Sequence, residues 1–186
     1  MAYTLSNMLP LGTVAPDFEL IDPLDGKKKS LQDLKSDKAT VIIFMCNHCP
    51  YVIHLIRDIV DTANEYMKRG VSFIAINPND VEKYVDDSPD RMVLIAKVLQ
   101  FPFPYLFDET QQVARAYDAA CTPDFYIFDG DMKLAYRGQY DESRPKRREV
   151  PITGKDFKSA LDAVLAGEEV DERQVPSGGC NIKWKS

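Results

Sequence analysis

The stretch Thr40-Val-Ile-Ile-Phe-Met-Cys-Asn-His-Cys-Pro50 decides the fold. Its first six residues form a continuous apolar, β-branched run, which is typical of a strand buried on both faces of a sheet. The run ends at Cys46, and a long amphipathic segment begins at Cys49 and Pro50. Proline is tolerated in the first turn of a helix, where its missing N–H has no partner to lose. The sequence therefore predicts a strand, a tight turn that carries two cysteines, and a helix.

The segment after Pro50 has the period of a helix. Its apolar residues recur at spacings of three and four and form one stripe: Val52, Leu55, Ile56, Ile59, Ala63, Tyr66 and Met67. Gly70 is placed to end the helix, and residues 71–76 form the next apolar run. Because the helix is long enough to cross over the sheet, the two strands are predicted to be parallel with a right-handed connection.

The rest of the chain completes an α/β pattern. Helical spacing recurs in residues 88–100, 111–117 and about 153–166, and residues 125–128 and 133–137 read as a β-hairpin. Residues 167–186 show no periodicity and form a C-terminal tail. We expect one domain over residues 1–186, with a central mixed β-sheet flanked by helices.

Composition narrows the class of protein. The chain has 186 residues and a net charge of −6, and an acidic surface argues against nucleic acid as a partner. The first 20 residues lack the pattern of a secretory signal. No stretch approaches the roughly 18 apolar residues that span a bilayer. We therefore expect a cytoplasmic protein that acts without a membrane.

The position of the cysteine pair gives it chemistry. Cys46 closes a buried strand, and Cys49 lies at the start of a helix, where free N–H groups and the helix dipole favour a thiolate. Thiols in such places have pKa values of about 3.5 to 7.5, against about 8.5 for free cysteine. His48 would add a positive charge beside Cys46. We assign Cys46, expected to be exposed at the strand end, as the nucleophile and Cys49 as the resolving thiol.

Two other interpretations of the pair are weaker. A structural zinc site needs two more ligands, and the remaining candidates, Cys121, Cys180 and His48 or His54, include no second closely spaced pair. An inert buried pair is disfavoured because a strand-to-helix turn is a surface position. The sequence therefore predicts no metal and no bound cofactor, and a metal-carrying or binding module is the non-enzymatic alternative.

A second motif supports the first. Thr122 and Pro123 precede the apolar strand at residues 125–128. A cis proline is usually a feature of a tight turn, and here it could present backbone groups to a peptide or a mixed disulfide. An ordinary trans turn is the alternative, but the cysteine pair favours the cis form.

These motifs resemble the thioredoxin superfamily. The segment from Gly12 to Leu20 is similar to the redoxin branch, which comprises alkyl hydroperoxide reductase and thiol-specific antioxidant (AhpC/TSA). Residues 44–52, with the CNHCP motif, and residues 76–80 and 179–184 resemble a group of peroxiredoxin-like thioredoxin-family proteins. The resemblance implies a thioredoxin-like fold with an N-terminal extension and a C-terminal tail.

The resemblance also implies an activity. Cys46 and Cys49 would be the redox pair of a thiol–disulfide oxidoreductase, and Pro123 the cis proline. Its partners would be protein disulfides or dithiols, with a thioredoxin- or reductase-type protein as one candidate electron donor. The alternative is a thiol peroxidase, an antioxidant that reduces hydroperoxides. Peroxiredoxins use Pro-x-x-x-Thr/Ser-x-x-Cys, and this pattern fails whether it is counted back from Cys46 or from Cys49.

Two further cysteines remain as extra thiol candidates. Cys121 lies two residues before Pro123, and either it belongs to the surface of the site or it is a small apolar loop residue. Cys180 follows Gly178 and Gly179 in the tail. The tail either folds back to offer a third thiol to the pair or is merely packed.

Overall fold

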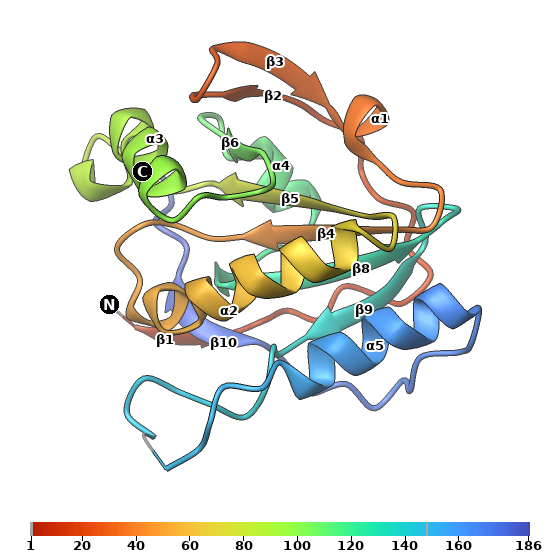
Figure 1. The fold of residues 1–186 in the computed structure, drawn as a ribbon. Coiled ribbons are helices and arrows are strands. Elements are labelled where there is room, and N and C mark those ends of the chain that lie inside the picture. Colours follow the sequence, from red (N-terminus) through yellow and green to blue (C-terminus); the bar gives the residue numbers. More distant parts are fainter. Residues whose placement is uncertain (1, 148) are drawn as a thin grey trace.

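Two sheets organise the chain in the computed structural model, which describes residues 2–147 and 149–186. Within these residues the larger sheet has seven strands in the order β3-β2-β6-β5-β4-β8-β9 (Figure 1). β4 is parallel to β5 and antiparallel to β8, so the sheet is mixed, as predicted. Its strands are β2 (Glu19–Asp22), β3 (Lys27–Ser30), β4 (Ala39–Phe44), β5 (Val71–Asn77), β6 (Tyr105–Phe107), β8 (Asp124–Asp129) and β9 (Leu134–Gly138).

Helices cover both faces of this sheet. Figure 1 shows α2 and α5 in front of it and α4 behind. The helices are α1 (Leu31–Leu34), α2 (Pro50–Met67), α3 (Pro89–Val98), α4 (Gln112–Ala116) and α5 (Lys155–Ala166), and a short 3₁₀ helix, η1, spans Val85–Asp87. The bounds of the long helices and of the hairpin lie within a few residues of the predicted ranges.

The alternation of side chains in β4 explains why both faces are covered. Val41 and Ile43 pack in the apolar cluster that includes α2 and α5, whereas Ile42 and Phe44 pack in the cluster that includes α4. Successive side chains of a strand project to opposite faces. The continuous apolar run therefore buries both sides of the central strand, as predicted.

A second, three-stranded antiparallel sheet lies at one end of the molecule. It consists of β1 (Tyr3–Leu5), β10 (Gly178–Asn181) and β7 (Cys121–Thr122), in that order. β10 runs beside the N-terminal end of α2 (Figure 1). The prediction of a tail without regular structure was wrong for these four residues. Two glycines leave the strand without alternating side chains, so its backbone pairing had no sequence signal.

None of the helices in the described ranges is long and apolar enough to cross a membrane.

Candidate active site: a buried cysteine pair

The cysteine pair lies in the turn between β4 and α2. The strand ends at Phe44, and the Met45 N–H still donates to the Ile76 carbonyl at 2.9 Å. Cys49 is the N-cap of α2, its carbonyl accepts from the Ile53 N–H at 2.9 Å, and Pro50 follows in the first turn. Cys49 therefore lies at the positive end of an 18-residue helix.

Both sulfurs are buried. Cys46 is 2% exposed and Cys49 is fully buried, so the predicted exposure of Cys46 at the strand end was wrong. The physical reason is that Cys46 packs against Thr122 of β7, and Cys46, Cys49 and Cys180 belong to one apolar cluster.

Thr122 is the contact shared by the two sulfurs. Its hydroxyl lies 3.6 Å from Cys46 Sγ, and Cys49 in its thiol form donates to its carbonyl at 3.1 Å. The Thr122–Pro123 peptide bond is cis, as predicted. The two motifs that the sequence set 73 residues apart thus meet within hydrogen-bonding distance.

The two thiols of the reduced pair have pKa values shifted in opposite directions. Its pKa is lowered to about 5, first by a hydrogen bond with Cys46 and further by Cys180, Thr122 and the Val52 backbone, against burial, which raises it. The pKa of Cys46 is raised well above its usual value by the hydrogen bond with Cys49, by burial and by the nearby charge of Asp87. The sequence had predicted stabilisation of the Cys46 thiolate by His48 instead.

Asp87 is the site residue that sequence reasoning missed. Its side chain is fully buried and accepts hydrogen bonds from the backbone N–H groups of Asn47 and His48, at 2.8 and 3.2 Å. Its second oxygen accepts from Asn79 Nδ2 at 2.8 Å and lies 2.6 Å from His48 Nδ1. Nothing in the acidic stretch around residue 87 marks it, because the contact joins two loops.

Two aromatic residues complete the environment of the turn. The ring of Tyr84 stacks on that of His48, with centroids 5.8 Å apart and planes within 6°. The buried Tyr105 hydroxyl donates to Asn47 Oδ1 at 3.0 Å, and its pKa is raised by burial and by the charges of Cys46 and Asp87. Each of the two residues between the cysteines thus contacts a tyrosine, Asn47 through Tyr105 and His48 through Tyr84.

Three side chains could offer donors to a metal. Cys46 Sγ, His48 Nδ1 and an Asp87 oxygen all lie within 4.8 Å of one another. Two nitrogen or oxygen ligands of one tetrahedral zinc stand roughly 3.3 Å apart, given bonds of about 2.0 Å. His48 Nδ1 and Asp87 Oδ2, at 2.6 Å, are closer than that. This separation does not fit two ligands of one zinc ion.

The two remaining cysteines have different surroundings. Cys121 is buried in β7, its sulfur contacts the Pro123 carbonyl at 3.7 Å, and burial raises its thiol pKa. Cys180 is buried in β10, and burial and its interaction with Cys49 raise its pKa to about 12. Of these two cysteines, Cys180 is the one that belongs to the apolar cluster of the pair.

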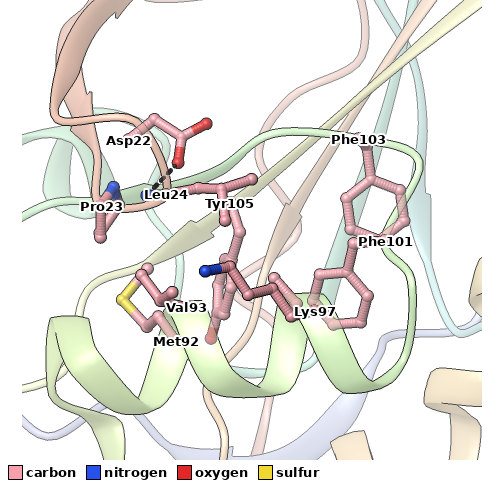
Figure 2. Close-up of a pocket in the computed structure, with 10 residues that line it drawn as sticks. Asp22, Pro23, Leu24, Met92, Val93, Lys97, Phe101, Phe103 and Tyr105 are labelled. Carbon is pink, nitrogen blue, oxygen red and sulfur yellow. Dashed lines mark hydrogen bonds between the residues drawn. The ribbon is translucent and has the colours of Figure 1, made fainter.

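A cavity of about 220 Å³ lies between α3 and the turn after β2. Figure 2 shows Phe101 and Phe103 at the opposite end of the cavity from Pro23. Tyr105 lines it as well and is the link between the cavity and Asn47. None of its lining residues is a cysteine, so the cavity is separate from the sulfur chemistry.

Comparison with known proteins places this geometry in a family. The family model described as AhpC/TSA family matches residues 11–137. The chain is 26% identical over 135 residues to thiol-disulfide oxidoreductase ResA of Geobacillus thermodenitrificans, covering 71% of each chain.

Solved structures agree in fold. An uncharacterized conserved protein from Geobacillus kaustophilus is 58% identical with a TM-score of 0.97, covering 100% of this chain and 97% of that one. A hypothetical protein from Sinorhizobium meliloti is 41% identical with a TM-score of 0.95, covering 98% and 99%. A thioredoxin-family thiol:disulfide interchange protein from Chlorobium tepidum, 21% identical with a TM-score of 0.64 over 84% and 96%, shows that the fold is thioredoxin-like.

Proposed function

The chain belongs to the AhpC/TSA family, and we propose that it is a thiol–disulfide oxidoreductase whose reacting dithiol is Cys46 and Cys49. One observation carries the proposal: the two cysteines lie in one apolar cluster at the start of α2, and both sulfurs contact Thr122, Cys46 through its hydroxyl and Cys49 through its carbonyl. A disulfide between them can form and reopen with little backbone movement. The name of the ResA relative supports the same class of reaction.

The first step is attack on a substrate disulfide. Cys49 carries the negative charge of the reduced pair, so it can take the proton of Cys46 as Cys46 reacts. The Cys46 sulfur then bonds to one substrate sulfur, and the other leaves as a thiolate. The Thr122 hydroxyl, 3.6 Å from Cys46 Sγ, stabilises the charge that develops there.

The second step resolves the mixed disulfide. Cys49 gives up its proton and attacks Cys46 Sγ. The Cys46–Cys49 bond forms, the bond between Cys46 and the substrate sulfur breaks, and that sulfur takes up the proton and leaves as a thiol. We propose protein disulfides or dithiols as partners and a dithiol protein as the electron donor. Because Cys46 is only 2% exposed, a partner must displace part of β10 or β7 to reach it.

Reduction of insulin disulfides by the reduced protein tests the proposal. We expect Cys46→Ser to fall to the uncatalysed rate. Cys49→Ser should instead accumulate a mixed disulfide between Cys46 and the substrate. Cys121→Ala is the matched control, since its sulfur contacts Pro123 and not the pair, and it should keep wild-type activity. Unchanged activity in Cys46→Ser would overturn the proposal.

Two further measurements establish the direction of electron transfer and test the thiol peroxidase alternative. A reduction potential near about −270 mV would make the protein a reductant, and one near about −120 mV an oxidant. Peroxide consumption should be no faster than that of a small free thiol. Efficient peroxide turnover would replace the proposal with a thiol peroxidase.

A further inference from the structure

The strand β10 brings a third sulfur to the cysteine pair. β10 is antiparallel to β7, with Cys180 opposite Thr122 and Asn181 opposite Cys121. Residues directly opposite each other in antiparallel strands project from the same face. Cys180 therefore lies on the face of Thr122, and Thr122 is the residue that contacts both Cys46 and Cys49.

Cys180 lies in the same apolar cluster as the pair. Cys180 and Cys49 perturb each other's pKa, and Cys46 and Cys49 do the same. Cys49 is thus the middle sulfur of three, each of them buried within one apolar cluster. An attacking thiol needs to reach only one sulfur of a disulfide, and Cys180 is already placed beside Cys49.

Gly179 is what allows β10 to lie this close. A Cβ atom at this position would overlap the backbone carbonyl of Thr122. Any other residue would therefore hold the strand away from β7, and Cys180 away from Cys49.

We propose that Cys180 is a third redox thiol, which takes over the disulfide of the Cys46–Cys49 pair by bonding to Cys49. This inference rests on the proposed function, because the substrate disulfide is the oxidant that first produces the Cys46–Cys49 bond. The Cys180 sulfur attacks Cys49 Sγ, the Cys49–Cys180 bond forms, and the Cys46–Cys49 bond breaks. The proton of Cys180 passes to Cys46, so one disulfide and one thiol are present before and after the step.

The surroundings support this exchange and give it a consequence. Burial and Cys49 raise the pKa of Cys180 in the reduced protein, and the ammonium of Lys183, three residues later, acts in the opposite direction. Once Cys49 is part of a disulfide it carries no charge, so its contribution to this raised pKa is removed. The product returns Cys46 as a thiol and ties β10 covalently to the start of α2. Oxidation therefore closes the strand over the site.

Disulfide mapping of the full chain tests the proposal. Wild type, Cys46→Ser, Cys180→Ser and the control Cys121→Ala are equilibrated with oxidised and reduced dithiothreitol. Remaining thiols are alkylated in acid, and linked peptides are identified by mass spectrometry. We expect Cys49–Cys180 to be the bridge in Cys46→Ser. Wild type and Cys121→Ala should contain both bridges, with alkylated Cys46 in the molecules that carry Cys49–Cys180.

The outcomes separate this inference from the proposed function. If wild type forms Cys46–Cys49 but neither wild type nor Cys46→Ser forms Cys49–Cys180, Cys180 is not a redox thiol and the proposed function stands. If Cys180→Ser forms no Cys46–Cys49 bridge in a buffer that oxidises dithiols, the proposed function itself fails, and with it the inference.

Discussion

His48 Nδ1 lies 2.6 Å from Asp87 Oδ2, within the turn that separates the two active-site cysteines. The side chain of Asp87 is fully buried. It also accepts hydrogen bonds from the backbone N–H groups of Asn47 and His48. Asp87 therefore holds the turn in place, and its charge opposes the Cys46 thiolate.

Replacing this carboxylate should make Cys46 more acidic. In Asp87→Asn, removing one nearby negative charge should lower the midpoint of Cys46 alkylation by roughly one to three pH units. Loss of hydrogen bonds to a buried group should cost about 1–3 kcal/mol of unfolding free energy. The rate of iodoacetamide alkylation, followed by mass spectrometry from pH 5 to 10, measures the midpoint.

Asp86→Asn is the matched control for this variant. Asp86 is the exposed neighbour of Asp87, and Asn47 contacts it only through its backbone carbonyl. Its midpoint should equal that of wild type. An equal shift in both variants would show that the effect comes from net charge and not from the contact of Asp87 with the turn.

The contribution of Cys49 to the stability of the reduced protein should increase as pH rises from about 5 to 9. The pKa of Cys49 is about 5 in the folded protein against 9.0 for an unperturbed thiol, so over this range the unfolded pair binds two protons and the native pair one. The slope is then at most about 1.4 kcal/mol per pH unit, and the stabilisation is lost as pH falls through 5. Cys46 keeps its proton throughout this window and adds no slope.

Wild type must be compared with a variant that lacks the Cys49 thiol, because Asp124 changes the unfolding free energy with pH in the opposite direction. Burial raises the pKa of that carboxyl to about 7, so its contribution is lost as pH rises towards 7. Urea unfolding under reducing conditions should therefore compare wild type with Cys49→Ser at each pH. The difference in unfolding free energy between wild type and Cys49→Ser should widen as pH rises, whereas the difference between wild type and Cys121→Ala should stay constant. Parallel curves for wild type and Cys49→Ser would contradict the lowered pKa of Cys49.

Periodicity explains which parts of this molecule could be predicted. The apolar run before Cys46 and the stripe after Pro50 are local patterns, and both fix an element and the face that it buries. The turn between them follows directly. The cis form of the Thr122–Pro123 bond was predicted from two motifs together, the proline before an apolar strand and the cysteine pair.

The rest depends on contacts between distant segments that leave no local pattern. Asp87 is 39 residues from His48 and meets it only because two loops fold together. β10 has no alternating side chains, and its place beside β7 follows from backbone pairing and the absence of a Cβ at Gly179. Cys46 was expected to be exposed but is buried, in an apolar cluster that includes Cys180 of β10.

The hydroxyl of Thr122 should matter for the acidity of Cys46. It lies 3.6 Å from the sulfur and lowers the pKa of Cys46. Thr122→Val keeps the shape and removes the hydrogen bond, which is worth about 1 kcal/mol. We expect Cys46 alkylation near neutral pH to slow by roughly fivefold, since a 1.4 kcal/mol change is tenfold. Thr122→Ser should restore the rate, and equal rates in all three proteins would exclude a role for the hydroxyl.

Adding one methyl group to β10 should open the site. The new Cβ of Gly179→Ala would overlap the fixed carbonyl of Thr122, whereas that of Gly178→Ala would meet the side chain of Tyr3, which is exposed and can turn away. Overpacking typically costs about 1–3 kcal/mol. Much of this cost should appear as displacement of β10, and alkylation of Cys46 should then be roughly tenfold faster in Gly179→Ala.

Gly178→Ala is the control. Its Cys46 should be alkylated at the wild-type rate, because the Tyr3 side chain can turn away without moving the strand. Equal acceleration by both variants would mean that any disturbance loosens this sheet. No acceleration in Gly179→Ala would mean that β10 does not limit access to Cys46.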